Sequence, residues 1–388
     1  MSDVLTRAEQ EILLDRAIEN LLSNPDRRRF AGRVCIVTGA GGSVGSELAQ
    51  QLAACNPARL VLVDHCEHAL FRIEQHLSEM YPDVAIEPVL CDVTRTVVVS
   101  RLLRRVGPDM VFHAAAYKHV TMAERNAVAA ARVNVLGTLA VLAATKEVGG
   151  RFVLISSDKA AAPTSVMGAT KRFAELAVLT DGDDKTRPIV VRFGNVLASS
   201  GSFVEVMRER IRRRLPVLVT DPDATRFFMT VAEAASLVMK ASLIAHGGET
   251  FWLDMGSQIR IGDLVDRLMR AETEQGFDSV PVQIIGLRPG EKLQEQLAAQ
   301  GISLKRTIDS RIWVAHQPLA VASARYALSM DALRRGVSRD EASTVLHALT
   351  TAVSEFVPSA FACETARRTD TRAASSSRRS THVRSKAA

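Results

Sequence analysis

Short apolar runs alternate with amphipathic stretches from Val34 to Phe193, and this alternation constrains the fold more than any other feature of the sequence. Strands are predicted at residues 34–37, 60–64, 85–90, 110–115, 151–156 and 188–193. Helices are predicted at about 43–54, 68–80, 95–106, 127–147 and 165–179. Apolar strands joined by helices predict a parallel sheet that is covered on both faces. The expected fold class is therefore α/β, with a doubly wound parallel sheet.

The regular alternation ends after Gly194, where shorter and mixed elements predict a smaller C-terminal lobe that is partly interleaved with the first. An amphipathic helix that ends at Pro25 is predicted over residues 6–24, from a stripe formed by Leu14, Ile18, Leu21 and Leu22. The expected division is an N-terminal amphipathic helical extension (1–29), the sheet domain (30–194), the smaller lobe (195–330), a terminal helical segment (331–358) and a disordered basic tail (359–388).

A glycine-rich turn, TGAGGSVGSEL, joins the first predicted strand to the first predicted helix. Gly39 permits the tight turn, Gly42 lets the backbone approach a pyrophosphate, and Gly45 lets the helix pack close to the sheet. Asp64 ends the second strand, where a carboxylate accepts hydrogen bonds from ribose hydroxyls and repels a 2′-phosphate. Because His65 rather than an arginine follows it, NAD is favoured over NADP as the cofactor. The sheet domain is thus expected to be a Rossmann-type NAD-binding domain.

Other predicted cofactor contacts lie in the same turn and after later strands. Asp92, in the tripeptide CDV after the third strand, is placed to meet the adenine amino group. The residues predicted to bind the cofactor are Gly39, Gly42, Ser43, Val44, Gly45, Asp64, Asp92, Val93, Ala114, Ala115 and Lys171. No metal site is predicted.

The stretch SSDKAAAPTSVMGATKR, residues 156–172, holds the predicted catalytic residues and lacks one expected part. A common chemistry on this fold uses a tyrosine four residues before a lysine as its acid–base group. Here the lysine is Lys171, which keeps a role in holding the nicotinamide ribose, and the position four before it is Met167. A thioether cannot transfer a proton. Asp158 and Lys159, at the end of the fifth strand, form an adjacent acid–base pair that favours an elimination over a plain oxidation.

Six motifs resemble, in the same order, those of a known family: TGAGGSVGSEL, HAAAYKHV, SSDKAAAPTSVMGATKR, RFGNVLASSGS, DPDATRFFMT and GLRPGEKLQEQL. From about Phe30 to Ala315 the sequence is similar to the CapD-like nucleotide-sugar 4,6-dehydratases, extended short-chain dehydrogenases of bacterial polysaccharide biosynthesis. The resemblance implies UDP-N-acetylglucosamine or a close relative as substrate, and a 4,6-dehydration in which the cofactor is regenerated. Many members carry a methionine at the position of Met167. Many also carry transmembrane helices ahead of the catalytic region, and this chain resembles the soluble form without them.

The resemblance also implies a role for each site residue. Neutral Lys159 is expected to remove the C5 proton, with burial beside a bound nicotinamide depressing its pKa and Asp158 offsetting this in part. Protonated Asp158 is expected to donate to the leaving C6 hydroxyl, and Ser157 to relay the C4 hydroxyl proton. The catalytic set is Ser157, Asp158, Lys159, Met167 and Lys171. The substrate-binding set is Lys118, His119, Asn195, Arg226, Arg288 and Glu291.

Two other functions fit parts of the sequence. A nucleotide-sugar 4-epimerase on the same fold has, as its usual mark, the tyrosine that Met167 replaces, and it has no need of the Asp158–Lys159 pair. A non-catalytic NAD-binding scaffold that recruits partners through its tail and first helix would not retain that pair either. The dehydratase is therefore the predicted function.

Charge and composition bear on partners and location. The net charge is +6, and residues 366–388 alone carry seven basic residues and one acid, so the rest of the chain is formally neutral and nucleic-acid binding is not predicted. No apolar run reaches the roughly 18 residues that span a bilayer, and the charged N-terminus is not a secretory signal. Five cysteines without CxxC spacing argue against a disulfide framework. We expect a cytoplasmic homo-oligomer that takes a UDP-sugar substrate, without nucleic acid and without an integral membrane segment.

Overall fold

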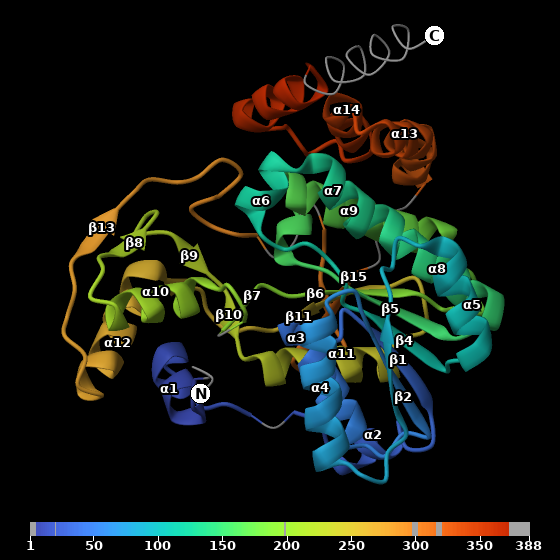
Figure 1. Cartoon of the computed structure of the whole chain (residues 1–388), viewed down its shortest axis with the longest axis horizontal. Helices are drawn as coiled ribbons and strands as arrows, with labels where there is room; N and C mark the ends of the chain where they lie inside the picture. The colour runs from blue at the N-terminus through green and yellow to red at the C-terminus, as the bar shows by residue number, and fades with distance from the viewer. Residues whose placement is uncertain (1–4, 20, 198, 297–301, 316–319, 372–388) are drawn as a thin grey trace, which may run out of the picture.

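A nine-stranded sheet forms the centre of the computed structural model, which describes residues 5–19, 21–197, 199–296, 302–315 and 320–371 (Figure 1). Its strands are β1 (Val34–Thr38), β2 (Arg59–Asp64), β3 (Ile86–Leu90), β4 (Met110–His113), β5 (Arg151–Ile155), β6 (Ile189–Arg192), β11 (Thr250–Leu253), β14 (Lys305–Arg306) and β15 (Ile312–Ala315). The order is β14-β15-β11-β6-β5-β4-β1-β2-β3. All neighbours from β11 to β3 are parallel, and β15 and β14 add an antiparallel edge beside β11.

Helices cover both faces of this sheet because its strands are apolar on both sides. One face carries α3 (Ser43–Ala53), α4 (Glu67–Met80) and α11 (Val231–Ile244), and the other carries α5 (Thr96–Val106), α8 (Thr138–Val148) and α9 (Val166–Asp181). Along β1, Cys35 and Val37 pack in the core with α3 and α11, whereas Ile36 packs in the core with α5 and α8. The predicted α/β class with a doubly wound parallel sheet is confirmed.

The order of the strands creates a crevice at their carboxyl ends. The chain runs outward from β1 to β2 and β3, then returns to place β4 on the other side of β1. Ligands of open α/β sheets bind at such a reversal, outside the carboxyl ends of the strands. The glycine-rich turn after β1 and the loop after β4 both open at this point.

A smaller lobe lies beside the carboxyl edge of the sheet and has its own apolar core (Figure 1). It consists of α10 (Phe203–Arg212), α12 (Ile261–Glu274) and three short strand pairs, namely β7 (Asn195–Val196) with β10 (Phe228–Met229), β9 (Thr225–Arg226) with β12 (Ile259–Arg260), and β8 (Val217–Val219) with β13 (Val282–Ile284). Between residues 195 and 330, however, α11, β11 and β15 pack in the main domain.

The N-terminal extension differs from the single predicted helix. Helix α1 (Arg7–Leu14) ends at Asp15, whose φ of 54° is left-handed. Pro25 does not close a helix but lies in the first turn of α2 (Asn24–Arg28). The physical reason lies in the packing: α1 packs in the core of the smaller lobe, whereas Leu22 packs in the core of the main sheet. The intervening residues must leave the helix to connect the two.

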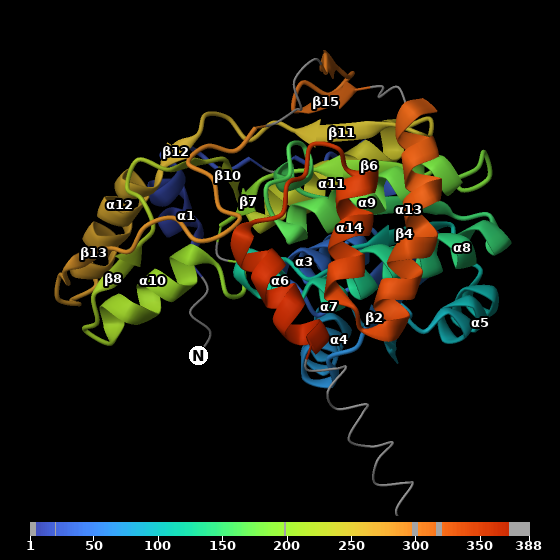
Figure 2. The ribbon, with the colours of Figure 1, turned by 90° about the horizontal axis from the view of Figure 1, so that it is seen from above.

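The C-terminal part also differs from expectation. Helix α13 (Ala320–Arg339) begins ahead of residue 331 and pairs with α14 (Ala342–Ala352), and residues 360–371 of the predicted disordered tail form a further helix. These helices form an outer layer on α9 and on α7 (Ala127–Ala131), as Figure 2 shows. The tail helix is ordered because Ala362 and Ala366 are buried in that layer. The remainder of the predicted tail, 372–388, lies outside the described residues.

One helical run bears on the expectation that the chain has no membrane segment. Among the described residues, Ala127–Val148 is the one helix that is long and apolar enough to cross a membrane by length and composition, with a mean hydropathy of 1.8. It comprises α7, the π-helical segment η1 (Arg132–Gly137) and α8. Because 67% of its apolar window is buried inside the protein, it packs here as a core helix between the sheet and its neighbours.

Candidate functional site

The glycine-rich turn between β1 and α3 forms a cradle that other residues could not make. Gly39 has a φ of 69°, and a Cβ there would lie 2.7 Å from the backbone nitrogen of Ala115. A Cβ on Gly45 would lie 2.0 Å from the carbonyl oxygen of Gly39, so only glycine lets α3 begin so close to β1. The N-terminus of α3 therefore faces the crevice with its first N–H groups uncapped by a side chain. These residues fit the pyrophosphate of a dinucleotide.

Asp64 lies at the end of β2, beside that turn. The side chain is buried and accepts two backbone hydrogen bonds, from Gly41 to Oδ2 and from Cys66 to Oδ1, each at 2.9 Å. The carboxylate is thus held at the edge of the cradle; Oδ1 also lies 3.5 Å from Nδ1 of His65, and Oδ2 keeps a second lone pair. The sequence analysis did not single out Gly41. Glycine is needed there, because a Cβ would lie 2.5 Å from Cβ of Ala69.

The other predicted cofactor residues line the same crevice in part. Ser43 Oγ accepts from the backbone N–H of Ser200, which comes from the loop after β7 and joins the two lobes over the turn. Asp92 is exposed, and its Oδ1 accepts from the N–H of Thr94. Val44, Ala114 and Ala115 are half-buried, and Val93 is buried in the core under α5.

Ser157, Asp158 and Lys159 meet at the carboxyl end of β5, where η2 (Asp158–Ala160) begins. Lys159 Nζ lies 3.1 Å from Asp158 Oδ1, and Ser157 Oγ donates to the same oxygen at 2.9 Å. Asn195, from the start of the smaller lobe, accepts from Lys159 Nζ through Oδ1 at 3.2 Å. Asp158 Oδ2 is buried without a hydrogen-bond partner among the described residues.

A second carboxylate acts on Lys159, and the sequence analysis missed it. Glu295 is 5% exposed, and its Oε1 lies 3.5 Å from Lys159 Nζ. Burial alone would lower the pKa of Lys159, but the charges of Asp158 and Glu295 outweigh burial and raise this pKa above its usual value. The expected lowering of this pKa concerns burial beside a bound nicotinamide and stays a prediction; in the ligand-free protein the pKa is raised. Its lysine is held as a cation.

Lys171 is also buried, in a contrasting environment. Its Nζ donates to the carbonyl oxygen of Ile155 at 2.6 Å, just ahead of the Ser157–Lys159 turn. Burial, opposed only in part by the carboxylate of Glu175, lowers the pKa of Lys171 to about 8. Nearby His113 is fully buried between the hydroxyls of Thr38 and Thr138, and burial followed by repulsion from Lys171 lowers its pKa to about 3.

Met167 is 4% exposed and belongs to the apolar cluster beneath the outer helices. It packs there with residues of α7 and α13 and donates no hydrogen bond from its side chain. The neighbouring Gly168 allows α9 to touch the catalytic turn, because a Cβ there would lie 2.5 Å from the carbonyl oxygen of Lys159. The thioether at this position thus contributes packing.

A buried ion cluster supports the catalytic turn from below. Glu175 of α9 is fully buried and accepts from Ser156 Oγ at 2.6 Å, from Arg192 Nε at 2.7 Å and from Arg172 Nη1 at 3.1 Å. Burial would raise the pKa of Glu175, but the guanidinium groups of Arg192 and Arg172 lower it overall. Arg192 also donates to the carbonyl oxygen of Ala160, so the cluster links β5, β6 and α9 to the turn.

Two further buried residues were missed by the sequence analysis. Asn134, within η1, accepts from the N–H of Tyr117 and donates to both the carbonyl of Tyr117 and the hydroxyl of Thr170. Glu124 Oε1 accepts from the N–H of Val166 at the start of α9. A π-helical segment in a long apolar helix is a signal for a functional position, but its register cannot be read from the sequence.

The predicted substrate contacts divide into two groups. Lys118 Nζ donates to Ser199 Oγ at 3.2 Å, and His119 lies against Gly201. Both residues therefore contact the loop after β7, whose Ser200 contacts Ser43. Burial lowers the pKa of Lys118, with partial compensation by Glu205. Burial and repulsion from Lys118 lower that of His119. Together with Asn195, these side chains are brought to the crevice.

The second group consists of Arg226, Arg288 and Glu291, and its hydrogen bonds are to other parts of the protein. Arg226 donates to the carbonyl oxygens of Thr225, Lys292 and Leu293, which anchors the segment that carries Glu295. Arg288 is exposed, and its backbone N–H donates to Glu291 Oε2 at 3.0 Å. The guanidinium of Arg226 and the carboxylate of Glu291 therefore have structural partners already. Among the described residues, no group of His, Cys, Asp and Glu side chains that could hold a metal ion is found.

Comparison with known proteins places these features in a family. Residues 35–317 match the family described as polysaccharide biosynthesis protein. The capsular polysaccharide biosynthesis protein CapD of Staphylococcus aureus is 41% identical over 76% of this chain and 49% of its own length. The chain spans about half the length of the curated relatives it matches first.

Two other proteins align over more of their length. A protein of Campylobacter jejuni named UDP-N-acetylglucosamine 4,6-dehydratase (inverting) is 31% identical over 69% of this chain and 77% of its own. The solved structure of Pen from Bacillus thuringiensis is 29% identical, with a TM-score of 0.69, and covers 75% of this chain and 90% of that one.

Proposed function

This chain belongs to the polysaccharide biosynthesis protein family, and we propose that it is an enzyme that modifies nucleotide sugars, specifically a UDP-N-acetylglucosamine 4,6-dehydratase. One observation carries the proposal. Asp158 and Lys159 form a proton-transfer pair, with Nζ and Oδ1 3.1 Å apart, in a fold where Met167 is buried at the usual place of a tyrosine. An elimination across C5 and C6 needs a base for one carbon and an acid for the other, whereas a 4-epimerase needs neither group.

The raised pKa of Lys159 does not exclude this role. Transfer of one proton from Lys159 Nζ to the Asp158 carboxylate would convert the ion pair into an amine and a carboxylic acid. The amine is the base that removes the C5 proton, and the carboxylic acid donates the transferred proton to the C6 hydroxyl as water leaves. No proton is exchanged with solvent in this conversion, and exclusion of water from the site by bound cofactor and substrate would favour the uncharged pair.

The cradle, Asp64 and Lys171 support NAD as the cofactor. The turn from Gly39 to Gly45 would hold the pyrophosphate, Asp64 the adenosine ribose and Lys171 the nicotinamide ribose. When bound, NAD supplies a hydride acceptor that later returns the hydride. A fixed carboxylate at Asp64 would repel the 2′-phosphate of NADP.

Lys118, His119 and Asn195 support a place for the nucleotide sugar between the lobes. All three belong to the rim formed by the loop after β4 and the start of the smaller lobe. Lys118 brings positive charge to a crevice that must accept a diphosphate. The exposed guanidinium of Arg288 is a further candidate for the diphosphate, because the described residues leave it without a side-chain hydrogen bond.

The decisive experiment is incubation of the full chain with NAD and UDP-N-acetylglucosamine, followed by mass spectrometry. We expect loss of one water and a 4-keto-6-deoxy product, which polysaccharide biosynthesis would consume, without accumulation of NADH. Substrate deuterated at C4 should give product deuterated at C6. An unchanged mass with a C4-epimeric product would establish the epimerase instead, and a stoichiometric rise of NADH with a stable oxidised sugar would contradict both.

A further inference from the structure

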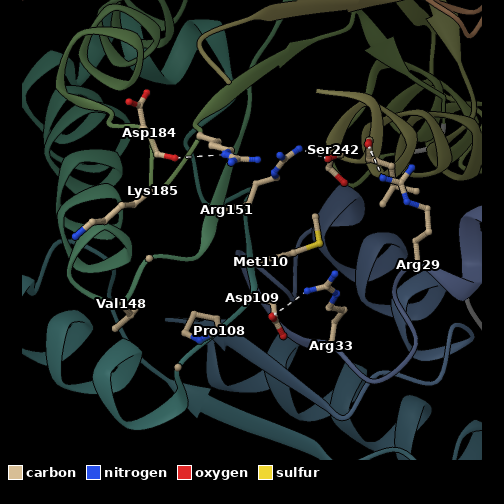
Figure 3. A pocket seen from close by; sticks show the side chains of 14 residues that line it. Arg29, Arg33, Pro108, Asp109, Met110, Val148, Arg151, Asp184, Lys185 and Ser242 are labelled. Atoms are coloured by element: carbon tan, nitrogen blue, oxygen red, sulfur yellow. Dashed lines mark hydrogen bonds and ion pairs between the residues drawn. The ribbon is translucent and has the colours of Figure 1, made fainter. Parts of the chain in front are cut away.

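A hollow of about 680 Å³ lies at the amino-terminal ends of the strands, at the other end of the sheet from Asp158 and Lys159. Its walls come from the starts of β1, β4, β5 and β6 and from the last turns of α8 and α11. Figure 3 shows Arg29, Arg33 and Arg151 around this shared space, with Met110 between them. A volume of this size is typical of sites for small molecules up to nucleotides.

Positive charge predominates in the lining of the hollow. The cationic lining residues are Arg29, Arg33, Arg151, Lys185 and Arg187, and the anionic ones are Asp109 and Asp184. The formal charge of the lining is therefore +3. Arg33 pairs with Asp109 at 3.2 Å, which leaves the excess on the other cations.

Helix capping accounts for only some of these guanidinium groups. Arg151 Nη1 donates to the carbonyl oxygens of Ser242 and Ala245, and Arg29 Nη2 donates to that of Leu243, so both cap the C-terminus of α11. Arg187 donates only through Nε, to the carbonyl oxygen of Asp184 at 3.3 Å. Within the described part of the chain, Arg29 Nη1, Arg151 Nη2 and both Nη atoms of Arg187 make no hydrogen bond.

The guanidinium of Arg151 is close enough to those of Arg187 and Arg29 to be repelled by both. Burial lowers the pKa of Arg151, and the charges of Arg187 and Arg29 lower it further, against an opposing attraction from Glu249. Arg187 has a φ of 39°, in the left-handed region that side chains other than glycine rarely adopt. The fold thus brings like charges together at a position that also has backbone strain. An anion with several charges would relieve the repulsion.

We propose that this hollow binds a phosphate-bearing anion with at least two negative charges, either inorganic diphosphate or the diphosphate of a nucleotide. Guanidinium groups bind phosphate through paired N–H donors, and the free Nη atoms of Arg29, Arg151 and Arg187 supply such donors from three separate segments. Arg151 lines the hollow at the first position of β5 and is only partly exposed, which favours a small anion over a flat membrane surface. The site is separate from the proposed catalytic crevice and does not depend on the proposed reaction.

Hydrogen–deuterium exchange of the full chain, resolved by peptide, tests the proposal without an activity readout. Peptides covering 145–152 and 181–190 report the hollow, and peptides covering 39–47 report the glycine-rich turn. We expect inorganic diphosphate and UDP each to protect the hollow peptides, and uridine not to protect them. In the double variant Arg29→Gln/Arg187→Gln, half-maximal protection of the hollow should need about tenfold more diphosphate, while the response of 39–47 is unchanged.

The matched control is Arg72→Gln/Arg101→Gln, which removes the same charge from exposed positions on α4 and α5. It should respond as the unmodified protein does. Failure of both phosphate compounds to protect the hollow, equal protection by uridine, or an equal loss in the control would overturn the proposal. Protection by vesicles of anionic lipid alone would overturn it as well, because it would make the hollow a membrane-contact surface.

Discussion

Lys159 and Met167 have different proposed roles. Lys159, at the carboxyl end of β5, transfers protons, whereas Met167, in α9, packs in an apolar cluster. If Asp158 and Lys159 carry the elimination, Lys159→Met and Asp158→Asn should each lower kcat by about a hundredfold or more, because a general acid or base is lost. Met167→Ala should cost at most about tenfold, since the buried thioether supplies only packing. Turnover measured beside NAD binding checks this.

NAD binding serves as the control, because none of these side chains forms the glycine cradle. Lys159→Met should also stop exchange of the C5 proton of the substrate with deuterated solvent. The opposite ranking, with Met167 critical and the pair dispensable, would refute the proposed roles.

Glu295 should set the pH dependence of the reaction through Lys159. Its charge is one of the two that raise the pKa of Lys159, so Glu295→Gln should lower that pKa and leave more of the neutral amine at a given pH. Because the proposed reaction uses the one proton that Lys159 and Asp158 share, activity should fall as pH rises through this pKa, and the variant should shift that basic limb of kcat to lower pH. Glu291→Gln, whose carboxylate accepts from the backbone of Arg288, is the control and should leave the limb in place.

Asp64 should determine the choice of cofactor. Asp64→Ala removes the fixed acceptor at the end of β2 and the charge that would repel a 2′-phosphate. We expect weaker NAD binding and a smaller preference for NAD over NADP, measured by titration of the two cofactors. An unchanged ratio of the two affinities would mean that this carboxylate does not reach the ribose.

At the scale of the elements, the tail helix caps a helix from another part of the chain. Glu341, the N-cap residue of α14, makes no side-chain cap, and Asp370 takes its place. Asp370 Oδ1 accepts from the N–H of Ala342 at 2.7 Å, and Oδ2 accepts from the N–H and the hydroxyl of Ser343. The carboxylate thus satisfies N–H groups that the first turn of a helix leaves free.

Asp370→Ala should therefore lower the free energy of unfolding by about 1 kcal/mol, the usual cost of losing an N-cap. Glu364→Ala, which breaks an exposed pair with Arg368, should cost less than about 0.5 kcal/mol. Chemical denaturation of the two variants compares them. Equal effects would show that the capping contact adds nothing beyond a surface charge.

At the scale of the whole molecule, the N-terminal segment connects the two lobes. Helix α1 packs in the core of the smaller lobe, where Glu9 pairs with Arg208. Arg16 then forms a double hydrogen bond with Glu233 of α11, at 2.6 and 2.9 Å. Burial would raise the pKa of Glu233, but Arg16 and the N–H of Thr230 lower it overall.

Arg16→Met should destabilise the protein by about 2 kcal/mol, because it leaves the fully buried Glu233 without its cation. This is less than the usual cost of breaking a buried ion pair, because Arg16 itself is partly exposed. The pKa of Glu233 is lowered in the folded state, so its contribution is present above the unfolded value of about 4.3 and is lost as pH falls through the folded value. The difference between variant and unmodified protein should shrink accordingly in acid denaturation curves. Arg213→Met, from an exposed pair, is the control and should have little effect at any pH.

The sequence by itself determined the features that depend on neighbouring residues. Alternation of strands and helices predicted every strand of the parallel sheet up to β6, because periodicity reports which faces are buried. The glycine spacing and Asp64 were found for a similar reason, since a turn between one strand and one helix is a local structure. The adjacency of Asp158 and Lys159 in the chain likewise placed both at the end of one strand.

Only the tertiary structure decided the protonation of the site and the ends of the chain. Glu295 acts on Lys159 from more than a hundred residues away, and Arg226 anchors the segment that carries it, so neither contact has a signal in local spacing. The break after α1 and the order of residues 360–371 follow from which core each segment reaches. A pKa depends on the summed charges and burial around a group, and a helix end depends on what it packs against. Both are properties of neighbours in space, which the order of residues along the chain does not specify.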